Sequence, residues 1–212
     1  MKMKRCLLIV VGCFCVLSIV AQDMKSVFIA MPDSIAPTLS QVNKEDCIDF
    51  LDSNMKAEVT NRFGNPVEMK ALTDDYVQMQ TSSAGTMEMK LLPVNDSIKV
   101  ICMVKTVCAS ACDSEVHFYT SDWSKKLNAK DFLQFPSADA FYLPVDTLTE
   151  ETVLIKKKAD MHPMKASLSK EDASLTFIYT TPDYLNKEDR EKLLPILRKE
   201  PIVYQWSEGK FR

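Results

Sequence analysis

The chain has 212 residues, of which 46% are apolar and 26% are charged. This ordinary globular balance excludes a disordered chain, a collagen-like chain and a coiled-coil rod. The formal net charge is −3, and it becomes −6 when Lys2, Lys4 and Arg5 are set aside, because 23 basic residues then face 29 acidic ones. Nucleic acid is therefore not expected as a partner, since phosphate binding requires a basic face.

The first 22 residues have the order of a secretory signal peptide. Three basic residues precede an apolar run over residues 6–21, which ends in the small Ala21 before the polar Gln22. This run is shorter than the roughly 20 residues that a spanning helix needs. We expect cleavage near Ala21 and export to the periplasm or beyond the cell. A retained N-terminal anchor and a lipidated Cys13 are the alternatives, and no later segment is apolar enough to span a membrane.

Cysteine usage agrees with export. Removal of the signal peptide leaves Cys47, Cys102, Cys108 and Cys112. An even number of cysteines in an oxidising compartment indicates disulfide bonding.

A helix is predicted near the start of the mature chain. Residues 24–42 contain Pro32 and Pro37 and are expected to be irregular. Residues 43–55 predict a helix capped by Asn43, with an acidic residue three positions later, as in a capping box. Its apolar face would consist of Cys47, Ile48, Phe50, Leu51 and Met55.

Alternating apolar and polar residues predict antiparallel strands from Val67 to Thr120. A three-residue turn at 83–85, with Gly85 at positive φ, would pair Met79 with Met89 and Val77 with Leu91. The same register would place Gln78 opposite Lys90 and Gln80 opposite Glu88 on a solvated face. The methionines are expected to be core residues.

The next hairpin has one register that suits both of its faces. Strands over 98–108 and 112–120, joined at 109–111, place Cys108 opposite Cys112. The flanking pairs are then Thr106 with Ser114, Lys105 with Glu115, Val104 with Val116, Met103 with His117, Cys102 with Phe118, and Ile101 with Tyr119.

This register favours a disulfide between Cys108 and Cys112 over a zinc site. The spacing Cys108-x3-Cys112-x4-His117 superficially resembles a zinc ligand set. However, the hairpin puts His117 on the face opposite the cysteines. Cys47 and Cys102 would be free or paired with each other.

The C-terminal half alternates between helices and strands. The predicted elements are a short helix at 128–133, a helix within 147–159 ending in Lys156–Lys158, a hairpin of 164–169 and 174–180, a helix from Asn186 to Pro195, and a strand at 202–206. Within 147–159 the run Val153–Ile155 would also suit a strand, and the helix is the favoured alternative. The fold class is therefore α+β with an antiparallel meander sheet packed by a few helices. We expect a single domain over residues 23–212, with an alternative division into related units of about 23–122 and 123–212.

Several stretches together resemble an exported family of Bacteroidales bacteria, domain of unknown function 3256. These are MPDS (31–34), MKAEVTN (55–61), EMKLLP (88–93), VKTVC (104–108), CDSE (112–115), FY (118–119), DW (122–123), TPDYL (181–185) and KEDR (187–190). The resemblance covers nearly all of the mature chain. It implies a Gram-negative envelope protein and supplies no catalytic residues.

The sequence contains no recognisable catalytic or cofactor motif. It lacks a Gly-x-Ser-x-Gly elbow, a His-Glu-x-x-His zinc site and a glycine-rich phosphate loop. We therefore predict no cofactor, no metal site and no catalytic residues, although a general-base role for His117 is conceivable. The favoured function is a binding module for another protein or a cell-surface polymer, and the alternative is a carboxylate-dependent hydrolase acting on glycans or peptides. The predicted binding face comprises Tyr76, Glu115, His117, Tyr119 and Trp123.

The signal peptide generates the first testable prediction. Mature protein purified from the native envelope should begin at Gln22 or Asp23 in N-terminal sequencing, because small Ala21 closes the apolar run. An intact Met1 would instead indicate a retained anchor, and a lipidated Cys13 would indicate a lipoprotein.

Overall fold

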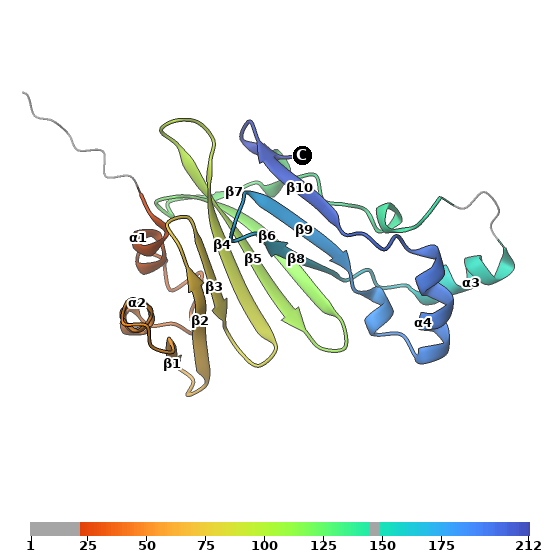
Figure 1. Ribbon diagram of the computed structural model, residues 1–212, viewed down its shortest axis with the longest axis horizontal. Coiled ribbons are helices and arrows are strands. Elements are labelled where there is room, and N and C mark those ends of the chain that lie inside the picture. Colours follow the sequence, from red (N-terminus) through yellow and green to blue (C-terminus); the bar gives the residue numbers. More distant parts are fainter. Residues whose placement is uncertain (1–21, 145–148) are drawn as a thin grey trace, which may run out of the picture.

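The computed structural model describes residues 22–144 and 149–212, so the predicted signal peptide lies almost wholly outside the described residues. Within these ranges the chain forms a seven-stranded sheet and a four-stranded sheet, both antiparallel. The α+β class is confirmed. Figure 1 shows α1 and α2 on one side of the large sheet and the small sheet on the other, with α3 and α4 beyond the end of the small sheet.

The large sheet is a meander whose strands neighbour one another in chain order. Its strands are β1 (Glu58–Thr60), β2 (Pro66–Leu72), β3 (Tyr76–Gln80), β4 (Gly85–Pro93), β5 (Lys99–Cys108), β6 (Cys112–Thr120) and β7 (Lys126–Leu127). The small sheet has the order β11-β10-β9-β8, with bounds β8 (Met164–Leu168), β9 (Ser174–Tyr179), β10 (Ile202–Ser207) and β11 (Lys210–Phe211).

Two helices, α1 (Met24–Ile29) and α2 (Gln41–Asp52), cover one face of the large sheet. The prediction of irregular structure throughout 24–42 is wrong, because Asp23 caps α1 and accepts a hydrogen bond from the Ser26 amide. The predicted cap of α2 is also wrong. Ser40 is the cap, and Asn43 is the third helical residue that completes a capping box with it.

A buried lysine joins these two helices. The Lys44 ammonium on α2 donates to the Ile29 carbonyl at 2.9 Å and to the Met31 carbonyl at 2.7 Å. These carbonyls lie at and just beyond the end of α1, where helical hydrogen bonding stops. Burial lowers the pKa of Lys44. The two hydrogen bonds offset part of the free-energy cost of burying its charge.

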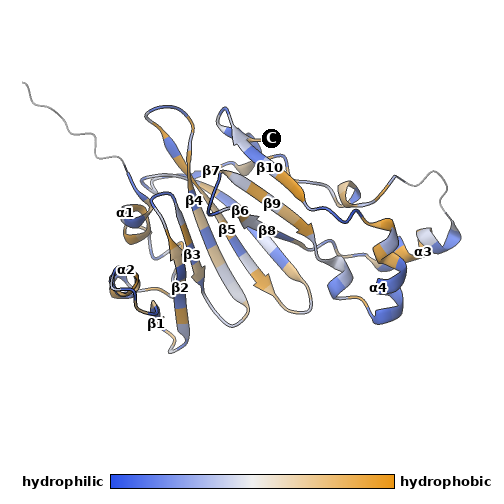
Figure 2. Ribbon diagram, viewed as in Figure 1, coloured by the Kyte–Doolittle hydropathy of each residue, from blue (hydrophilic) through white to orange (hydrophobic). Residues whose placement is uncertain are grey.

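Each face of the large sheet contributes to a separate core. The helix-side core is rich in methionine, as predicted, with members Met24, Met31, Met69, Met79, Met87, Met89 and Met103. The inter-sheet core lies between the two sheets and includes Tyr76, Cys102, Phe118, Leu175, Phe177 and Tyr179. In Figure 2 hydrophobic residues recur along the strands of both sheets, whereas α4 is largely hydrophilic.

The register of β3 and β4 differs from the predicted one by two residues. Val77 pairs with Met89 and Met79 with Met87. The last pair is Gln80 with Thr86, so five residues separate the paired positions, and the Thr81 amide donates to the Gly85 carbonyl across this turn. Gly85 does not take a positive φ, which Gly64 and Gly209 do. A Cβ at position 85 would instead come within 2.8 Å of the Thr81 hydroxyl oxygen.

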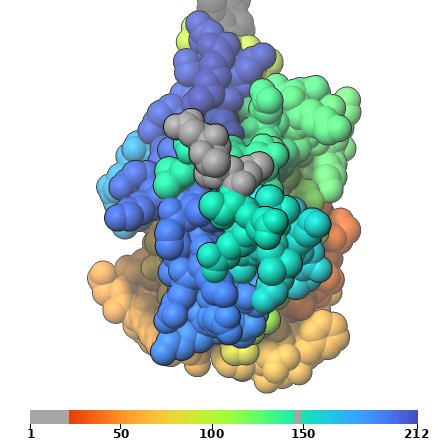
Figure 3. Space-filling view, turned by 90° about the vertical axis from the view of Figure 1, so that its right-hand side faces the viewer, coloured from red at the N-terminus to blue at the C-terminus, as the bar shows by residue number. Residues whose placement is uncertain are grey.

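The hairpin of β5 and β6 has the predicted register. Cys108 lies opposite Cys112, and all six flanking pairs are confirmed. The predicted elements of the C-terminal half are also present: a 3-10 turn at Ala129–Asp131, α3 (Glu150–Lys158), the β8–β9 hairpin, α4 (Lys187–Leu193) and β10. The side-by-side helices α3 and α4 (Figure 3) are joined by an ion pair between Lys158 Nζ and Asp189 Oδ1 at 2.6 Å.

The polar face of β4 is covered rather than solvated. Glu88 and Lys90 were expected in water, but their exposed fractions are 8% and 2%. The small sheet covers them, and the Lys90 ammonium donates to the Lys170 carbonyl at 3.1 Å and pairs with Asp75 at 3.0 Å.

Glu88 is also one of three side chains that bind the free edge of β8. The edge amides of Met164, Ala166 and Leu168 donate to Asp113 Oδ1 at 3.1 Å, Ser114 Oγ at 2.9 Å and Glu88 Oε2 at 2.8 Å, respectively. The other oxygen of Glu88 accepts from the Tyr76 hydroxyl at 3.3 Å and from Gln78 Nε2 at 3.0 Å. These bonds fix the small sheet on the large one.

The buried Glu88 carboxyl makes stability depend on pH. Burial raises the pKa of Glu88 above its ordinary value of 4.5. The folded protein then binds this proton more tightly than the unfolded chain, so the free energy of unfolding falls as pH rises from the unfolded to the folded pKa. We expect Glu88→Gln to remove this loss, because a glutamine oxygen can still accept from Leu168 and its amide can donate to a reoriented Gln78.

Urea unfolding at several pH values between about 4 and about 8 tests this effect. The stability of Glu88→Gln relative to wild type should grow with pH by about 1.4 kcal/mol for each unit of pKa elevation. Glu171→Gln, an exposed residue of the β8–β9 turn, is the control and should parallel wild type. Parallel profiles for Glu88→Gln and wild type would contradict the prediction.

Candidate functional site

The tip of the β5–β6 hairpin is closed by a disulfide. Cys108 and Cys112 end the two strands on either side of the turn at 109–111, and their sulfur atoms are bonded at 2.04 Å. The predicted pairing is therefore present, and these sulfurs are not available as zinc ligands. No group of three or more potential metal-ligating residues occurs among the described residues.

The other two cysteines are free thiols in different cores. Cys47 lies in the helix-side core and Cys102 in the inter-sheet core, on opposite faces of the large sheet. Of the two alternatives, pairing with each other is wrong. Burial raises the pKa of Cys47 to about 11 and also raises that of Cys102, so both thiols stay protonated at neutral pH.

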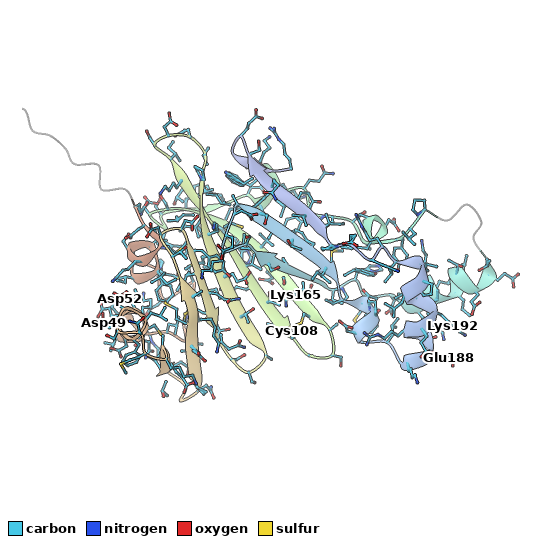
Figure 4. All side chains as sticks on the ribbon, in the orientation of Figure 1. Asp49, Asp52, Cys108, Lys165, Glu188 and Lys192 are labelled. Atoms are coloured by element: carbon cyan, nitrogen blue, oxygen red, sulfur yellow. A yellow bond between two sulfur atoms is a disulfide. The ribbon has the colours of Figure 1, made fainter. Side chains whose placement is uncertain are left out.

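A hollow of about 650 Å³ lies where the disulfide-bonded tip meets the loop before β8. This volume is within the range of ligand pockets. We call it the tip hollow, and its lining residues are Ala109, Ser110, Ala111, Asp113, Met161, His162, Pro163 and Tyr184. Cys108 marks the neighbouring end of β5 in Figure 4.

Hydrogen bonds hold the two walls of the tip hollow together. The Thr180 hydroxyl donates to the Cys112 carbonyl at 2.5 Å, and the Thr180 amide donates to the Pro163 carbonyl at 3.1 Å. Asp113 accepts the Met164 amide beside them. The turn at 109–111 and the loop at 161–163 are therefore fixed to each other through one threonine and one aspartate.

Three tyrosines and a histidine gather beside the tip hollow, and we call them the phenol–imidazole cluster. The Tyr179 hydroxyl is hydrogen-bonded to His162 Nδ1 at 2.7 Å, and the two rings stack with centroids 6.1 Å apart. The Tyr142 ring meets Tyr179 edge-on at 6.0 Å. The Tyr184 hydroxyl accepts from the Met161 amide at 3.1 Å and donates to the Met161 carbonyl at 3.2 Å.

The electrostatics of this cluster favour neutral phenols. Burial raises the pKa of Tyr142 and of Tyr184, so both remain protonated and act as hydrogen-bond donors. The Lys156 ammonium lies over the Tyr142 ring, 4.1 Å from its centroid. Because Nδ1 of His162 is bonded to Tyr179, the other ring nitrogen, Nε2, is the one that this exposed side chain can offer to a ligand.

The lining of the tip hollow combines apolar walls with few polar groups. Ala109, Ala111, Met161 and Pro163 supply apolar surface. Asp113 is the one carboxylate among the described lining residues. The arrangement is therefore suited to holding a ligand through apolar contact and hydrogen bonds.

The residues of the predicted binding face do not form one exposed surface. Tyr76 is buried in the inter-sheet core, while Tyr119 and Trp123 are buried on the helix side, with exposed fractions of 3%, 6% and 9%. The grouping is wrong because α1 covers the helix side, where the Trp123 indole donates to the Val27 carbonyl at 2.9 Å. Glu115 and His117 do lie together near the surface, with His117 Nε2 3.0 Å from Glu115 Oε2.

Sequence reasoning missed the tip hollow. The sequence patterns place Tyr179 in a strand and assign no role to His162 or Tyr184. The one available signal was the disulfide itself, which marks a turn held rigid at the hollow's edge.

The fold and the hollow define an α+β protein of two packed antiparallel sheets with a disulfide-bonded hairpin tip. The chain belongs to the family described as "Protein of unknown function (DUF3256)", which it matches over residues 16–211. The predicted resemblance is therefore confirmed. No curated protein matches the chain.

A solved structure shares this fold. It is described as a domain of an uncharacterized protein from Porphyromonas gingivalis W83, a Bacteroidales bacterium, and is 30% identical in sequence, with a TM-score of 0.80. The similarity covers 91% of this chain and 98% of that domain.

Among the described residues, no helix has the length and apolar character needed to cross a membrane.

Removal of the disulfide should loosen the tip without unfolding the protein. The closed loop has only five residues, so the chain-entropy estimate of its stabilisation is about 2 kcal/mol. We expect the double variant Cys108→Ser, Cys112→Ser to lose about this much in urea unfolding and to exchange the amides of residues 106–114 faster. Adding a reductant should shift wild type to the same values and leave the variant unchanged. Equal stability of the variant and oxidised wild type would contradict the prediction.

Proposed function

We propose that this protein is an exported, non-catalytic binding module of the Gram-negative cell envelope, and that a segment of a partner protein occupies the tip hollow. The observation that carries the proposal is the hollow itself, with one wall closed by a disulfide and the other held by Thr180. A preformed site loses less conformational entropy when it binds than a flexible one.

Export is supported by the N-terminal sequence and by the cysteine chemistry. Disulfides persist in oxidising compartments such as the periplasm, and the tip disulfide closes the turn that lines the site. The residues at the expected cleavage point also contact the fold. Gln22 donates to the Ser121 carbonyl at 2.8 Å, and Asp23 caps α1, so a chain cleaved after Ala21 keeps both contacts.

The lining favours a peptide segment. Apolar walls of alanine, methionine and proline suit an aliphatic or aromatic side chain, while His162, Asp113 and Ser110 supply hydrogen-bonding groups at the rim. A cell-surface polymer in the same hollow is the other outcome that the experiment distinguishes.

A matched pair of tryptophan variants tests the proposal. Ser110→Trp places a large ring in the tip turn that lines the hollow, whereas Ser97→Trp places the same ring in the exposed β4–β5 turn, outside the hollow. Tagged mature protein is incubated with native envelope extract, and the captured material is identified. We expect wild type and Ser97→Trp to recover one stoichiometric protein, and Ser110→Trp to lose at least about tenfold of it.

Three results would count against the proposal. Equal capture by both tryptophan variants would place the partner elsewhere on the molecule. Recovery of a polysaccharide that Ser110→Trp no longer binds would replace the protein partner by a polymer. Turnover of glycans or peptides by purified wild type, abolished by Asp113→Asn, would favour the carboxylate-dependent hydrolase.

A further inference from the structure

A second pocket, of about 260 Å³, lies on the helix side of the large sheet. The segment 35–39 arches over one side of it, and the β3–β4 turn and the end of β5 form the rest. We call it the Lys105 pocket. Its apolar lining residues are Ile35, Ala36, Pro37, Leu39, Met87 and Val107, and its hydroxyl-bearing ones are Thr38, Thr81, Ser82, Thr86 and Thr106.

Lys105 supplies the one charge among the described residues that line this pocket. Its ammonium donates to the Ile35 carbonyl at 2.7 Å. An ammonium has three N–H donors, and no second hydrogen bond or ion pair joins Lys105 to the described part of the chain. Its cross-strand neighbour Glu115 bonds to His117 instead. Two donors of a half-buried cation are therefore left for solvent or for a ligand.

The environment of this ammonium favours an anion. Burial lowers the pKa of Lys105, because the charged form loses hydration that the pocket walls do not replace. Lys44 is a useful comparison, since its buried ammonium donates to two carbonyls where that of Lys105 donates to one. A carboxylate bound beside Lys105 would restore the missing partner through a charge-assisted hydrogen bond.

The arch over the pocket is preformed. The Arg62 amide donates to the Thr38 carbonyl at 3.0 Å, and the Leu39 amide donates to the Ala36 carbonyl at 3.1 Å. Leu39 itself is buried in the helix-side core. The pocket is separate from the tip hollow, because no described residue lines both.

We propose that the Lys105 pocket binds a small amphipathic carboxylate, with a short aliphatic chain against Met87 and Pro37 and the carboxylate on Lys105 Nζ. The volume is slightly below the roughly 300–1,000 Å³ of most ligand pockets, so the ligand is a short-chain acid and not a long lipid. The apolar lining favours an aliphatic tail, and the single cation favours a negatively charged head group. This site does not depend on the function proposed for the tip hollow.

Hexanoate is the probe, and the readout is an NMR titration of the methyl groups of the folded mature protein. We expect hexanoate to shift the methyl signals of Val107, Met87 and Leu39. Hexan-1-ol has a similar tail without the charge, and hexylamine carries the opposite charge. Both should bind at least about tenfold more weakly, the scale of one charge-assisted hydrogen bond.

Two lysines on β5 provide a matched comparison. Lys105→Met keeps the aliphatic stem and removes the charge, and it should weaken hexanoate binding at least about tenfold. Lys99 also lies on β5 and donates to a backbone carbonyl, that of Gln22 at 3.1 Å, but it does not line the pocket. Lys99→Met should bind hexanoate as wild type does. Thermal unfolding of both variants shows whether the arch stays folded.

A substitution at the exposed rim keeps the proposal testable if Lys105→Met unfolds. Val107 lines the pocket with 65% of its surface exposed. Val107→Asp should weaken hexanoate binding by repelling the carboxylate, whereas Val107→Thr, of similar size and uncharged, should not. The proposal is overturned if hexanoate leaves the pocket methyl groups unshifted, if hexan-1-ol binds equally well, or if Val107→Asp and Val107→Thr bind hexanoate alike.

Discussion

The free edge of β8 is satisfied by side chains of the large sheet and not by another strand. Three alternate amides of this edge bind Asp113, Ser114 and Glu88, so an edge that could pair with a foreign strand is covered. The same bonds place the small sheet over β4–β6, create the inter-sheet core and bring the loop at 161–163 to the disulfide-bonded tip. Both the second core and the tip hollow therefore depend on polar side chains of the large sheet.

Local pairing could be predicted from the sequence wherever two independent constraints agreed. In the β5–β6 hairpin a three-residue turn, a cysteine pair and the match of Lys105 with Glu115 leave one register. In the β3–β4 hairpin a shift of two residues keeps every side chain on its face, so the alternation of Met79 and its neighbours could not detect the longer turn. The short helix α1 was missed because the nearby prolines suggested irregular chain.

The covering of a face could not be predicted, because it is set by residues far away in sequence. The alternation of apolar and polar residues correctly assigns Glu88 to the polar face of β4. Only the docking of β8 shows that this face is excluded from solvent. The same limit applies to the sites. Tyr119 and Trp123 were predicted to lie on an exposed binding face, yet both are buried on the helix side of the large sheet. His162 joins Tyr179 and the β5–β6 tip only through the packing of the two sheets.

The division of the two free thiols between the two cores makes each core separately observable. Cys47 reports on the layer between α2 and the large sheet, and Cys102 on the layer between the sheets. Both are protonated and shielded, so an alkylating reagent reaches each one only when its own layer opens. The rate of modification at each cysteine, resolved by mass spectrometry, thus measures how often each half of the molecule comes apart. Equal rates would mean that the layers open together, and unequal rates would rank them.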